Sequence, residues 1–234
     1  MFPNIEGAHL VLVGGSVRDM MLKKKPKDQD YVVITELKFD ELVDRINATP
    51  GAEVFQAKKE FLTIRCKVGS DIIDIAYPRK DHNYEDGRHP DGVEQVKTLK
   101  DDASRRDFTI NAMYFDPRGG LIDFFNGSSD IKAKTIRCVG DPIKRFEEDH
   151  LRIIRAIRFS AQLGFIIEHG TFYGMVKVAP KLINTDFNRI RDEINKGLKY
   201  NARLTLRYIR ELELFPILAS LGLNFQLTSK EVPK

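Results

Sequence analysis

The stretch "VLVGGSVRD" (Val11–Asp19) is followed nine residues later by "DQDYVVI" (Asp28–Ile34). Each stretch contains a short apolar run rich in β-branched residues, which predicts strands over Leu10–Val13 and Tyr31–Ile34. A glycine pair, an arginine and two acids therefore lie within one strand–turn–helix–strand segment. This segment contains the candidate phosphate site and the candidate metal site of the chain.

The glycine pair indicates a phosphate site. Gly14 and Gly15 follow a predicted strand, so their backbone N–H groups can approach a phosphate with no Cβ in the way. A helix is expected over Ser16–Lys24, with Ser16 as a candidate N-cap, and its positive end points at the same place. Arg18 can add a charge-assisted bond to a phosphate oxygen. The alternative is a plain turn, since neither the P-loop spacing nor the dinucleotide spacing is present.

The acids indicate a metal site. Asp28 and Asp30 stand at i and i+2 at the start of a strand, so their side chains share one face. Like charges that close favour a cation between them, and Mg²⁺ takes carboxylates together with substrate phosphate oxygens. Asp74, on the predicted strand "DIIDIAY", is the candidate third acid, with Asp71 as its alternate. Such a site suits nucleotidyl transfer by two metal ions. A solvated turn without a ligand is the alternative.

The rest of the first half predicts further strands and helices. Phe39–Ala48 has the pattern of an amphipathic helix, and Phe61–Val68 with Asp71–Pro78 predicts a hairpin. Ile110–Asp116 with the following "LIDFF" predicts another hairpin. Together these elements indicate a mixed sheet with helices, an α+β fold. The polar stretch Arg79–Glu94 predicts a long mobile loop of the kind that is usually functional.

From Asp141 onward the pattern becomes helical. Apolar residues recur at helical spacing at Leu151, Ile154, Ile157 and Leu163. Gly164 is a natural end for this helix, and "NRIRDEINKGL" and "RLTLRYIRELELFPILASLGL" predict two more. With a boundary near residue 140, the expected domains are 1–139 and the helical 140–222, followed by a tail, 223–234, that frays.

The two halves differ in charge. Residues 1–131 carry 19 Lys and Arg against 23 Asp and Glu, a net charge of −4, and residues 132–210 carry 17 against 8, a net charge of +9. This asymmetry favours metal on the acidic half and a phosphate-rich partner on the basic half. Uneven surface charge without a partner is the alternative.

Cysteine content and hydropathy narrow the class further. Cys66 and Cys138 are too few for a disulfide framework or a zinc site, so both are expected to be small buried residues in a reducing compartment. No signal pattern is seen, and no apolar run approaches the ~18 residues of a membrane span. A cytoplasmic protein without a membrane partner is expected.

Two more stretches carry candidate site residues. In "SRRDFTINAM" (Ser104–Met113), Arg106 can reach a phosphate and Asp107 a ribose hydroxyl, although a strand entry with flanking surface charges is the alternative. In "EEDHLRIIRAIRF", an acid and three arginines follow one another at steps of three and form one stripe on a helix. These residues are Asp149, Arg152, Arg155 and Arg158.

The stripe combines two kinds of hydrogen-bonding group. A carboxylate accepts from an exocyclic amine, and a guanidinium donates to a ring acceptor. Such a pair can recognise C or A without a nucleic-acid template. A surface ladder of salt bridges is the alternative.

Taken together, these stretches resemble the class II tRNA nucleotidyltransferase and bacterial poly(A) polymerase family. The similarity runs through "LVGGSVRDMML…KDQD", "DGRHP", "LKDDASRRDFTINAMYFD", "GDPIKRFEEDHLRIIRAIRFSAQLGF" and "NRIRDEINKGL", and it covers most of residues 10–222. The resemblance implies a nucleotidyltransferase (polymerase β-like) head with a mixed sheet, followed by an all-helical neck. It also implies an enzyme that adds C and A from CTP and ATP to the tRNA 3′ end.

The resemblance implies residue roles as well. Asp28 and Asp30 bind Mg²⁺, Asp74 is the third acid, and Asp149 with Arg152 reads C or A. The stretch 79–94 matches a flexible loop that helps the site to switch from C to A. The residues expected to bind the nucleotide are Gly14, Gly15, Ser16, Arg18, Arg106, Asp107, Asp149, Arg152, Arg155 and Arg158.

Family members continue into body and tail domains that hold the tRNA, whereas this sequence ends at Lys234. We therefore expect the RNA-anchoring part to be missing, minimal, or supplied by a second copy or a partner subunit. Two other functions stay open. One is a poly(A) polymerase or A-adding enzyme with the same site, and the other is a nucleotide- or RNA-binding module or subunit that needs a partner.

Overall fold

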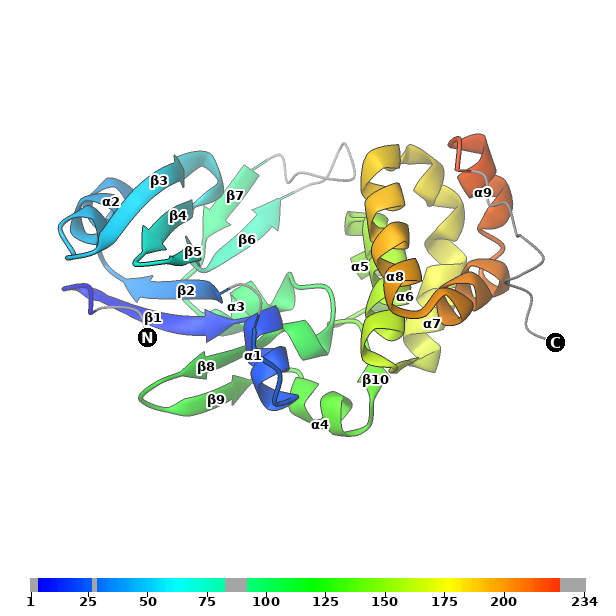
Figure 1. The fold of residues 1–234 in the computed structure, drawn as a ribbon, viewed down its shortest axis with the longest axis horizontal. Helices are drawn as coiled ribbons and strands as arrows, with labels where there is room; N and C mark the ends of the chain where they lie inside the picture. The colour runs from blue at the N-terminus through cyan, green and yellow to red at the C-terminus, as the bar shows by residue number, and fades with distance from the viewer. Residues whose placement is uncertain (1–3, 27–28, 83–91, 224–234) are drawn as a thin grey trace. The chain divides into compact units, whose positions relative to one another are not determined.

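A computed structural model describes residues 4–26, 29–82 and 92–223 (Figure 1). The chain forms two compact units, an N-terminal unit that ends at Asp141 and a C-terminal unit that begins at Pro142. Among the described residues, no helix is long and apolar enough to cross a membrane.

The N-terminal unit is built on a seven-stranded mixed sheet, which confirms the predicted fold class (Figure 1). The strand order is β3-β4-β5-β2-β1-β8-β9. Neighbours are antiparallel except β2 and β5, which run parallel. The strands are β1 (Ala8–Val13), β2 (Gln29–Thr35), β3 (Ala52–Lys58), β4 (Thr63–Val68), β5 (Asp71–Ala76), β8 (Met113–Asp116) and β9 (Gly120–Asp123).

The sheet buries apolar side chains on both faces. Val32 and Val33 are adjacent on β2 yet belong to different apolar clusters, because successive side chains of a strand point to opposite faces. Val33 packs with Leu42 of the amphipathic helix α2 (Phe39–Asn47), and Val32 packs with Ala103 of α3 (Leu99–Ser104). The predicted helix over 39–48 is confirmed.

Both predicted hairpins are present. β4 and β5 pair through the turn that contains Gly69, whose φ of +59° is a conformation that glycine adopts without a Cβ clash. β8 and β9 form the second antiparallel hairpin. The strand predicted from residue 110 begins later, because the chain before β8 forms a 3₁₀ turn, η2 (Thr109–Asn111).

Helix α1 (Gly15–Met21) starts earlier than predicted. The predicted N-cap, Ser16, is wrong: Ser16 lies inside the helix and is buried, and Gly14 occupies the N-cap position. Gly14 has φ 72° and ψ −130°, so the change of direction between β1 and α1 requires a positive φ that serine rarely adopts.

The predicted loop over residues 79–94 is partly wrong. Strands β6 (Arg79–His82) and β7 (Gly92–Gln95) pair antiparallel, with Arg79 opposite Gln95. Their polar sequences lack an alternating apolar pattern, and backbone pairing forms the ribbon in its absence. The middle of the stretch, 83–91, lies outside the described residues.

The remaining elements of the N-terminal unit are short. They are η1 (Lys59–Phe61), α4 (Gly127–Lys132) and β10 (Thr135–Ile136). Cys66 and Cys138 are both buried and unbridged, as predicted. Burial raises the pKa of the Cys66 thiol to about 11, with a further contribution from Asp74.

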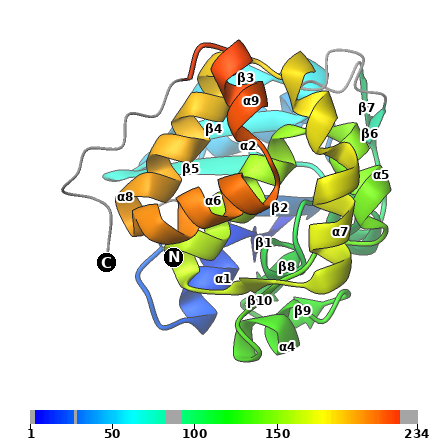
Figure 2. The same cartoon turned by 90° about the vertical axis from the view of Figure 1, so that its right-hand side faces the viewer.

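The C-terminal unit is largely helical, as predicted. Its helices are α5 (Pro142–Glu148), α6 (Leu151–Leu163), α7 (His169–Val178), η3 (Ala179–Asn184), α8 (Phe187–Glu211) and α9 (Phe215–Ser220), with the short strand β11 (Ile166–Ile167). α6 ends at Gly164 in the left-handed conformation, as predicted. α6 and α8 pack side by side (Figures 1 and 2). Gly197 of α8 lies close to Thr205 of the same helix, since a Cβ there would lie 3.0 Å from the Thr205 hydroxyl oxygen.

The two helices predicted after α7 are both present. They are consecutive parts of α8 and are separated by a kink at Asn201, where φ is −156° and ψ is 92°. The second segment then breaks after Glu211, and α9 restarts with Pro216 in its first turn, where proline is tolerated. The predicted tail lies almost wholly outside the described residues.

Candidate active site

The turn between β1 and α1 brings the predicted glycines and Arg18 together. The Gly14 N–H donates to the Met113 carbonyl at 3.1 Å, which ties the turn to β8. Arg18 is buried, and its Nη2 would lie 3.5 Å from a Cβ built on Gly15. The guanidinium therefore lies against the glycine backbone, in a position that a larger side chain would contact.

Arg18 is held by a chain of polar side chains. Its Nη1 donates to Asn111 Oδ1 at 2.7 Å, and Asn111 Nδ2 donates to Asp107 Oδ1 at 3.1 Å. Asp107 Oδ1 also accepts from the Phe108 N–H at 2.7 Å. The chain thus links two predicted site residues, Arg18 and Asp107, through a residue that sequence reasoning missed. Its only signal was the position of Asn111 inside "RRDFTINAM".

Arg106 lies at the same turn. Its Nη1 would lie 3.4 Å from a Cβ built on Gly14, and its guanidinium lies 5.4 Å from the ring centre of Tyr114. Two predicted cations, Arg18 and Arg106, therefore lie beside the two glycines. Each guanidinium also has a carboxylate partner, since Arg18 Nη2 lies 2.8 Å from Asp19 Oδ1 and Arg106 Nη2 lies 2.9 Å from Asp102 Oδ2.

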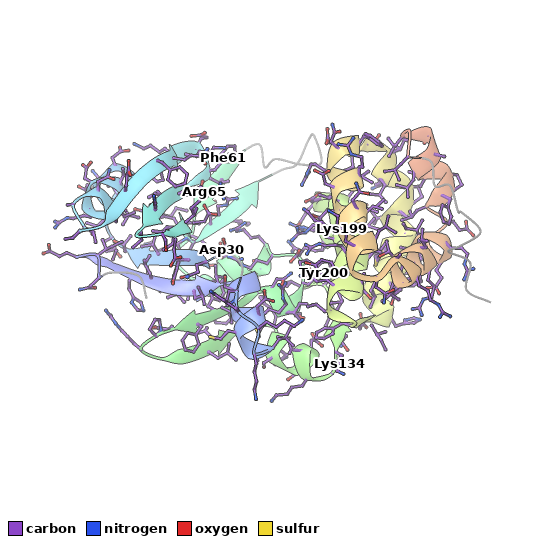
Figure 3. All side chains as sticks on the ribbon, in the orientation of Figure 1. Asp30, Phe61, Arg65, Lys134, Lys199 and Tyr200 are labelled. Carbon is purple, nitrogen blue, oxygen red and sulfur yellow. The ribbon has the colours of Figure 1, made fainter. Side chains whose placement is uncertain are left out.

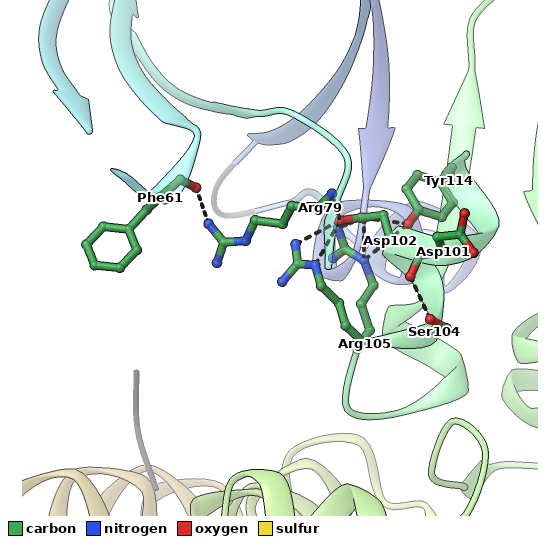
Figure 4. Close-up of polar contacts among 8 residues, drawn as sticks. Phe61, Arg79, Asp101, Asp102, Ser104, Arg105 and Tyr114 are labelled. Atoms are coloured by element: carbon green, nitrogen blue, oxygen red, sulfur yellow. Dashed lines mark hydrogen bonds and ion pairs between the residues drawn. The ribbon is translucent and has the colours of Figure 1, made fainter. Parts of the chain in front are cut away.

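Asp102 was not predicted, and it is the most buried charged side chain of this region (Figure 4). Its Oδ1 accepts from Arg105 Nε at 2.9 Å and from the Arg79 N–H at 3.3 Å, and its Oδ2 accepts from Arg106 Nη2 at 2.9 Å and from the Tyr114 hydroxyl at 2.6 Å. Burial alone would raise the pKa of Asp102, but Arg106, Arg105 and the Tyr114 hydrogen bond hold it well below its usual range. The carboxylate is therefore ionised at neutral pH.

Asp30 and Asp74 lie in one row across the sheet. Asp30 is the register partner of Asp74 on the parallel strand β5, and Asp74 is the register partner of Arg65 on β4. Register partners project from the same face, so the row is Asp30, Asp74 and Arg65; Figure 3 labels its two ends. Arg65 Nε and Nη2 donate to the two Asp74 carboxylate oxygens at 2.7 and 2.9 Å.

The row and the glycine turn lie at the same end of the sheet. Leu12 pairs with Tyr31, so β1 ends where β2 begins, and Gly14 lies beside the start of β2, where Asp30 stands. Asp28, the first acid of the predicted pair, lies outside the described residues. No cluster of three or more His, Cys, Asp or Glu side chains forms within the described ranges, which provide a pair of carboxylates here.

In the C-terminal unit, Asp149 and Arg152 are close in sequence and differ in their partners. Asp149 Oδ1 accepts from the Leu151 N–H at 3.0 Å at the start of α6, and its Oδ2 lies 3.7 Å from Arg189 Nη2. Arg152 is buried and donates to Glu148 Oε2 at 2.8 Å and to the Arg145 carbonyl at 3.0 Å.

Arg155 and Arg158 share an aromatic neighbour on α6. Their guanidinium carbons lie 5.3 and 3.6 Å from the ring centre of Phe159. Arg158 Nε also donates to Glu193 Oε2 of α8 at 2.7 Å, and Glu193 is buried. Burial would raise the pKa of Glu193, but Arg158 and the Lys196 hydrogen bond lower it overall. Sequence reasoning missed Glu193 because its partner is 35 residues away.

A mixed sheet with a glycine turn, two cations at that turn and paired carboxylates on adjacent strands defines the head of a nucleotidyltransferase. The sequence model described as "Poly A polymerase head domain" matches residues 10–137. The chain belongs to this family, which confirms the resemblance.

Known proteins of this kind match most of the chain. It is 35% identical over 209 residues to the CCA-adding enzyme of Oceanobacillus iheyensis, covering 86% of this chain and 49% of that protein. It is 33% identical over 246 aligned positions to poly(A) polymerase I of Haemophilus influenzae, covering 97% of this chain and 51% of that protein. The chain spans about half the length of these relatives.

Solved structures of CCA-adding enzymes superpose on most of this chain. The Bacillus stearothermophilus CCA-adding enzyme in complex with CTP superposes with a TM-score of 0.74 at 30% identity, over 93% of this chain and 49% of that one. The Thermotoga maritima CCA-adding enzyme complexed with tRNA superposes with a TM-score of 0.74 at 32% identity, over 90% of this chain and 48% of that one.

Proposed function

We propose that the chain is a template-independent RNA nucleotidyltransferase that adds C and A from CTP and ATP to the 3′ end of tRNA. The observation that carries this proposal is the grouping, at one end of one sheet, of the glycine turn, Arg18 and Arg106 with the carboxylates of Asp30 and Asp74. The relatives with CTP and tRNA in their structures support the choice of substrates.

The carboxylates fit Mg²⁺. Asp30 is half-buried at the start of β2 and offers the hard oxygen ligands that Mg²⁺ prefers, and Asp74 is its register partner on β5, with both carboxylate oxygens on Arg65. We assign Asp28 and Asp30 as metal ligands, with Asp74 as the third catalytic acid. The chemistry that Mg²⁺ supplies when bound is a lowered pKa for a coordinated hydroxyl and neutralised triphosphate charge.

The turn residues position the triphosphate. The backbone of Gly14, Gly15 and Ser16 offers N–H donors, and Arg18 and Arg106 offer charge-assisted bonds. Positioning of this kind accounts for much of the rate in phosphoryl transfer. Asp107, buried beside Asn111, is assigned to the ribose hydroxyl.

The proposed reaction forms one bond and breaks one. The RNA 3′-oxygen bonds to the α-phosphorus, and the bond from that phosphorus to the bridging oxygen breaks. Pyrophosphate leaves, and the hydroxyl proton passes to solvent. The in-line arrangement of the two oxygens is what the turn and the carboxylates together have to maintain.

We assign base selection to the C-terminal unit. Asp149 and Arg152 are proposed to read the Watson–Crick edge of C or A, with Arg155 and Arg158 beside the nucleotide. The catalytic head is assigned to residues 1–139 and the helical neck to 140–222. The basic stretch 132–210 is proposed to bind the RNA backbone, so the affinity for RNA is expected to fall steeply as the salt concentration rises. We propose the cytoplasm as the location of the protein.

A second candidate is a poly(A) polymerase that uses the same site with a preference for A. The match to poly(A) polymerase I of Haemophilus influenzae over 97% of this chain favours it. Nucleotide choice and product length separate the two functions. A second copy or a partner subunit that anchors the RNA is compatible with either one.

Primer extension with Mg²⁺ tests the proposal. We would supply tRNA transcripts that end before CCA, after C and after CC, together with an unrelated RNA, each with CTP and ATP singly and combined. Addition that stops at CCA on tRNA alone is the expected result. Long A tails on any RNA would assign the polymerase function, and no incorporation on any RNA would contradict both.

A further inference from the structure

Asp102 combines complete burial with two guanidinium partners. It lies in the last turn of α3 with no exposed surface and accepts from Arg105 and Arg106. A carboxylate at such a site is costly to bury unless it is fully hydrogen-bonded and paired. Because it is fully enclosed in this structure, any effect of Asp102 on a ligand has to pass through the groups that it holds.

The group that leads from Asp102 to the site is Arg106. Arg106 Nη2 lies 2.9 Å from Asp102 Oδ2, and Arg106 Nη1 lies against Gly14, 3.4 Å from where a Cβ would be. The carboxylate thus holds Nη2 of the guanidinium, and Nη1 lies at the glycine turn. The cluster of Asp102, Arg105 and Arg106 has one negative and two positive charges. Its net positive charge favours an anion.

Tyr114 and Arg79 hold the carboxylate in turn. The Tyr114 hydroxyl donates to Asp102 Oδ2 at 2.6 Å, and burial raises the pKa of Tyr114 above its usual value, so the phenol keeps its proton. The Arg79 N–H, at the first residue of β6, donates to Asp102 Oδ1, and the Arg79 guanidinium donates to the Phe61 carbonyl (Figure 4). The carboxylate therefore has partners from β6, from β8 and from the two arginines that directly follow α3.

We infer that Asp102 is a positioning residue for nucleotide binding: it orients Arg106 at the Gly14 turn so that the guanidinium meets the triphosphate. This inference rests on the proposed function only in taking the turn as the triphosphate site. Asp102 itself touches no ligand. Its removal should weaken the recognition of phosphates and leave recognition of the nucleoside unchanged.

The test measures the binding of ATP and of adenosine by calorimetry, in Mg²⁺ and without RNA. In Asp102→Asn we expect affinity for ATP to fall by about tenfold or more, as for the loss of a charge-assisted contact. Affinity for adenosine should stay unchanged. Asp101→Asn is the matched control, because Asp101 is the adjacent acid on the same helix, is exposed, and contacts Thr98 rather than an arginine.

A double-mutant cycle separates positioning from general structural damage. In an Arg106→Gln background, Asp102→Asn should cost little further ATP affinity, because the group through which it acts is gone. Three outcomes would overturn the inference: wild-type ATP affinity in Asp102→Asn, equal losses for ATP and adenosine, or an undiminished loss in the Arg106→Gln background.

Tyr114→Phe keeps the inference testable if Asp102→Asn does not fold. It removes one hydrogen bond to Asp102 and retains the ring beside Arg106. A smaller loss of ATP affinity, absent in the Arg106→Gln background, supports the inference, and no loss overturns it. Because binding is measured without RNA, a wild-type chain that binds ATP and transfers nothing would contradict the proposed function alone.

Discussion

Two arginine-rich segments of this chain hold their guanidinium groups in different ways. In the N-terminal unit, Arg105 and Arg106 converge on a single buried carboxylate, Asp102. In the C-terminal unit, the arginines of α6 are distributed over separate partners: Arg152 pairs with Glu148, and Arg158 pairs with Glu193 and lies over Phe159.

The two arrangements respond differently to substitution. A convergent cluster fixes the direction of its cations closely, and one substitution disturbs all of it. A distributed stripe loses one contact at a time, and its Arg158 also links α6 to α8. We therefore expect substitutions in the first segment to change the binding of phosphates, and substitutions in the second to change stability and base choice separately.

The largest effect on activity should come from the Asp30 carboxylate, which belongs to neither arginine-rich segment. In Asp30→Asn, nucleotide incorporation should fall by at least about 10³-fold, because the carboxylate that we propose as a metal ligand is lost while the transition-state charge stays the same. ATP binding should be partly retained through Arg18 and Arg106. Primer extension and calorimetry measure the two properties.

Asp44→Asn is the control for this experiment, since Asp44 is an exposed acid on α2. Its activity should match the wild type. Full activity in Asp30→Asn would refute the metal assignment.

The next effect concerns stability and the distributed segment. Glu193→Gln should lower the free energy of unfolding by about 3 kcal/mol, because it leaves the Arg158 guanidinium with an uncompensated charge between α6 and α8. Glu211→Gln, on the same helix in an exposed pair with Arg207, should change it by less than about 0.5 kcal/mol. Urea unfolding compares the two, and equal changes would show that the Arg158 contact is no different from a surface pair.

A smaller effect should appear in base choice. Arg152→Ala should change the ratio of kcat/KM for CTP and ATP by about tenfold, with less effect on the rate for the better nucleotide. Arg207→Ala is the control, because Arg207 is an exposed arginine of the same unit. An unchanged ratio would count against the assignment of Arg152 to base recognition.

The smallest effect is a difference in pH dependence. The pKa values of Asp102 and Glu193 are lowered in the folded state, so the unfolded chain binds more protons as the pH falls below about 4. Their stabilisation is complete above the unfolded pKa and is lost as the pH falls through the folded pKa. The free energy of unfolding of Glu193→Gln should therefore fall less between pH 5 and pH 3 than that of the wild type. Urea unfolding at pH intervals of about 0.5 measures both. An identical slope would contradict the lowered pKa of Glu193.

Local patterns predicted many of the elements. The apolar runs located β1 and β2, the glycine turns located the hairpins, and helical spacing located α2 and α6. Predictions that depended on single residues were less accurate. Ser16 was expected at the N-cap, but the backbone at Gly14 needs a positive φ, and the helix begins one residue earlier. The ribbon of β6 and β7 has no apolar alternation, so only its backbone pairing identifies it.

The residue types and spacings of the candidate site can be seen in the sequence alone: glycines after a strand, acids at i and i+2, and arginines at steps of three on one helix. These are short-range spacings, and the 2.0 and 3.6 periodicities of strands and helices convert them directly into faces. Which of these groups meet depends on contacts between elements that are far apart in the chain. Asn111 reaches Arg18 across 93 positions, Asp74 comes beside Asp30 by parallel pairing, and Asp102 receives the Tyr114 hydroxyl of β8 and the Arg79 N–H of β6. Contacts of this kind depend on chain reversal and burial, and no local pattern in the sequence encodes them.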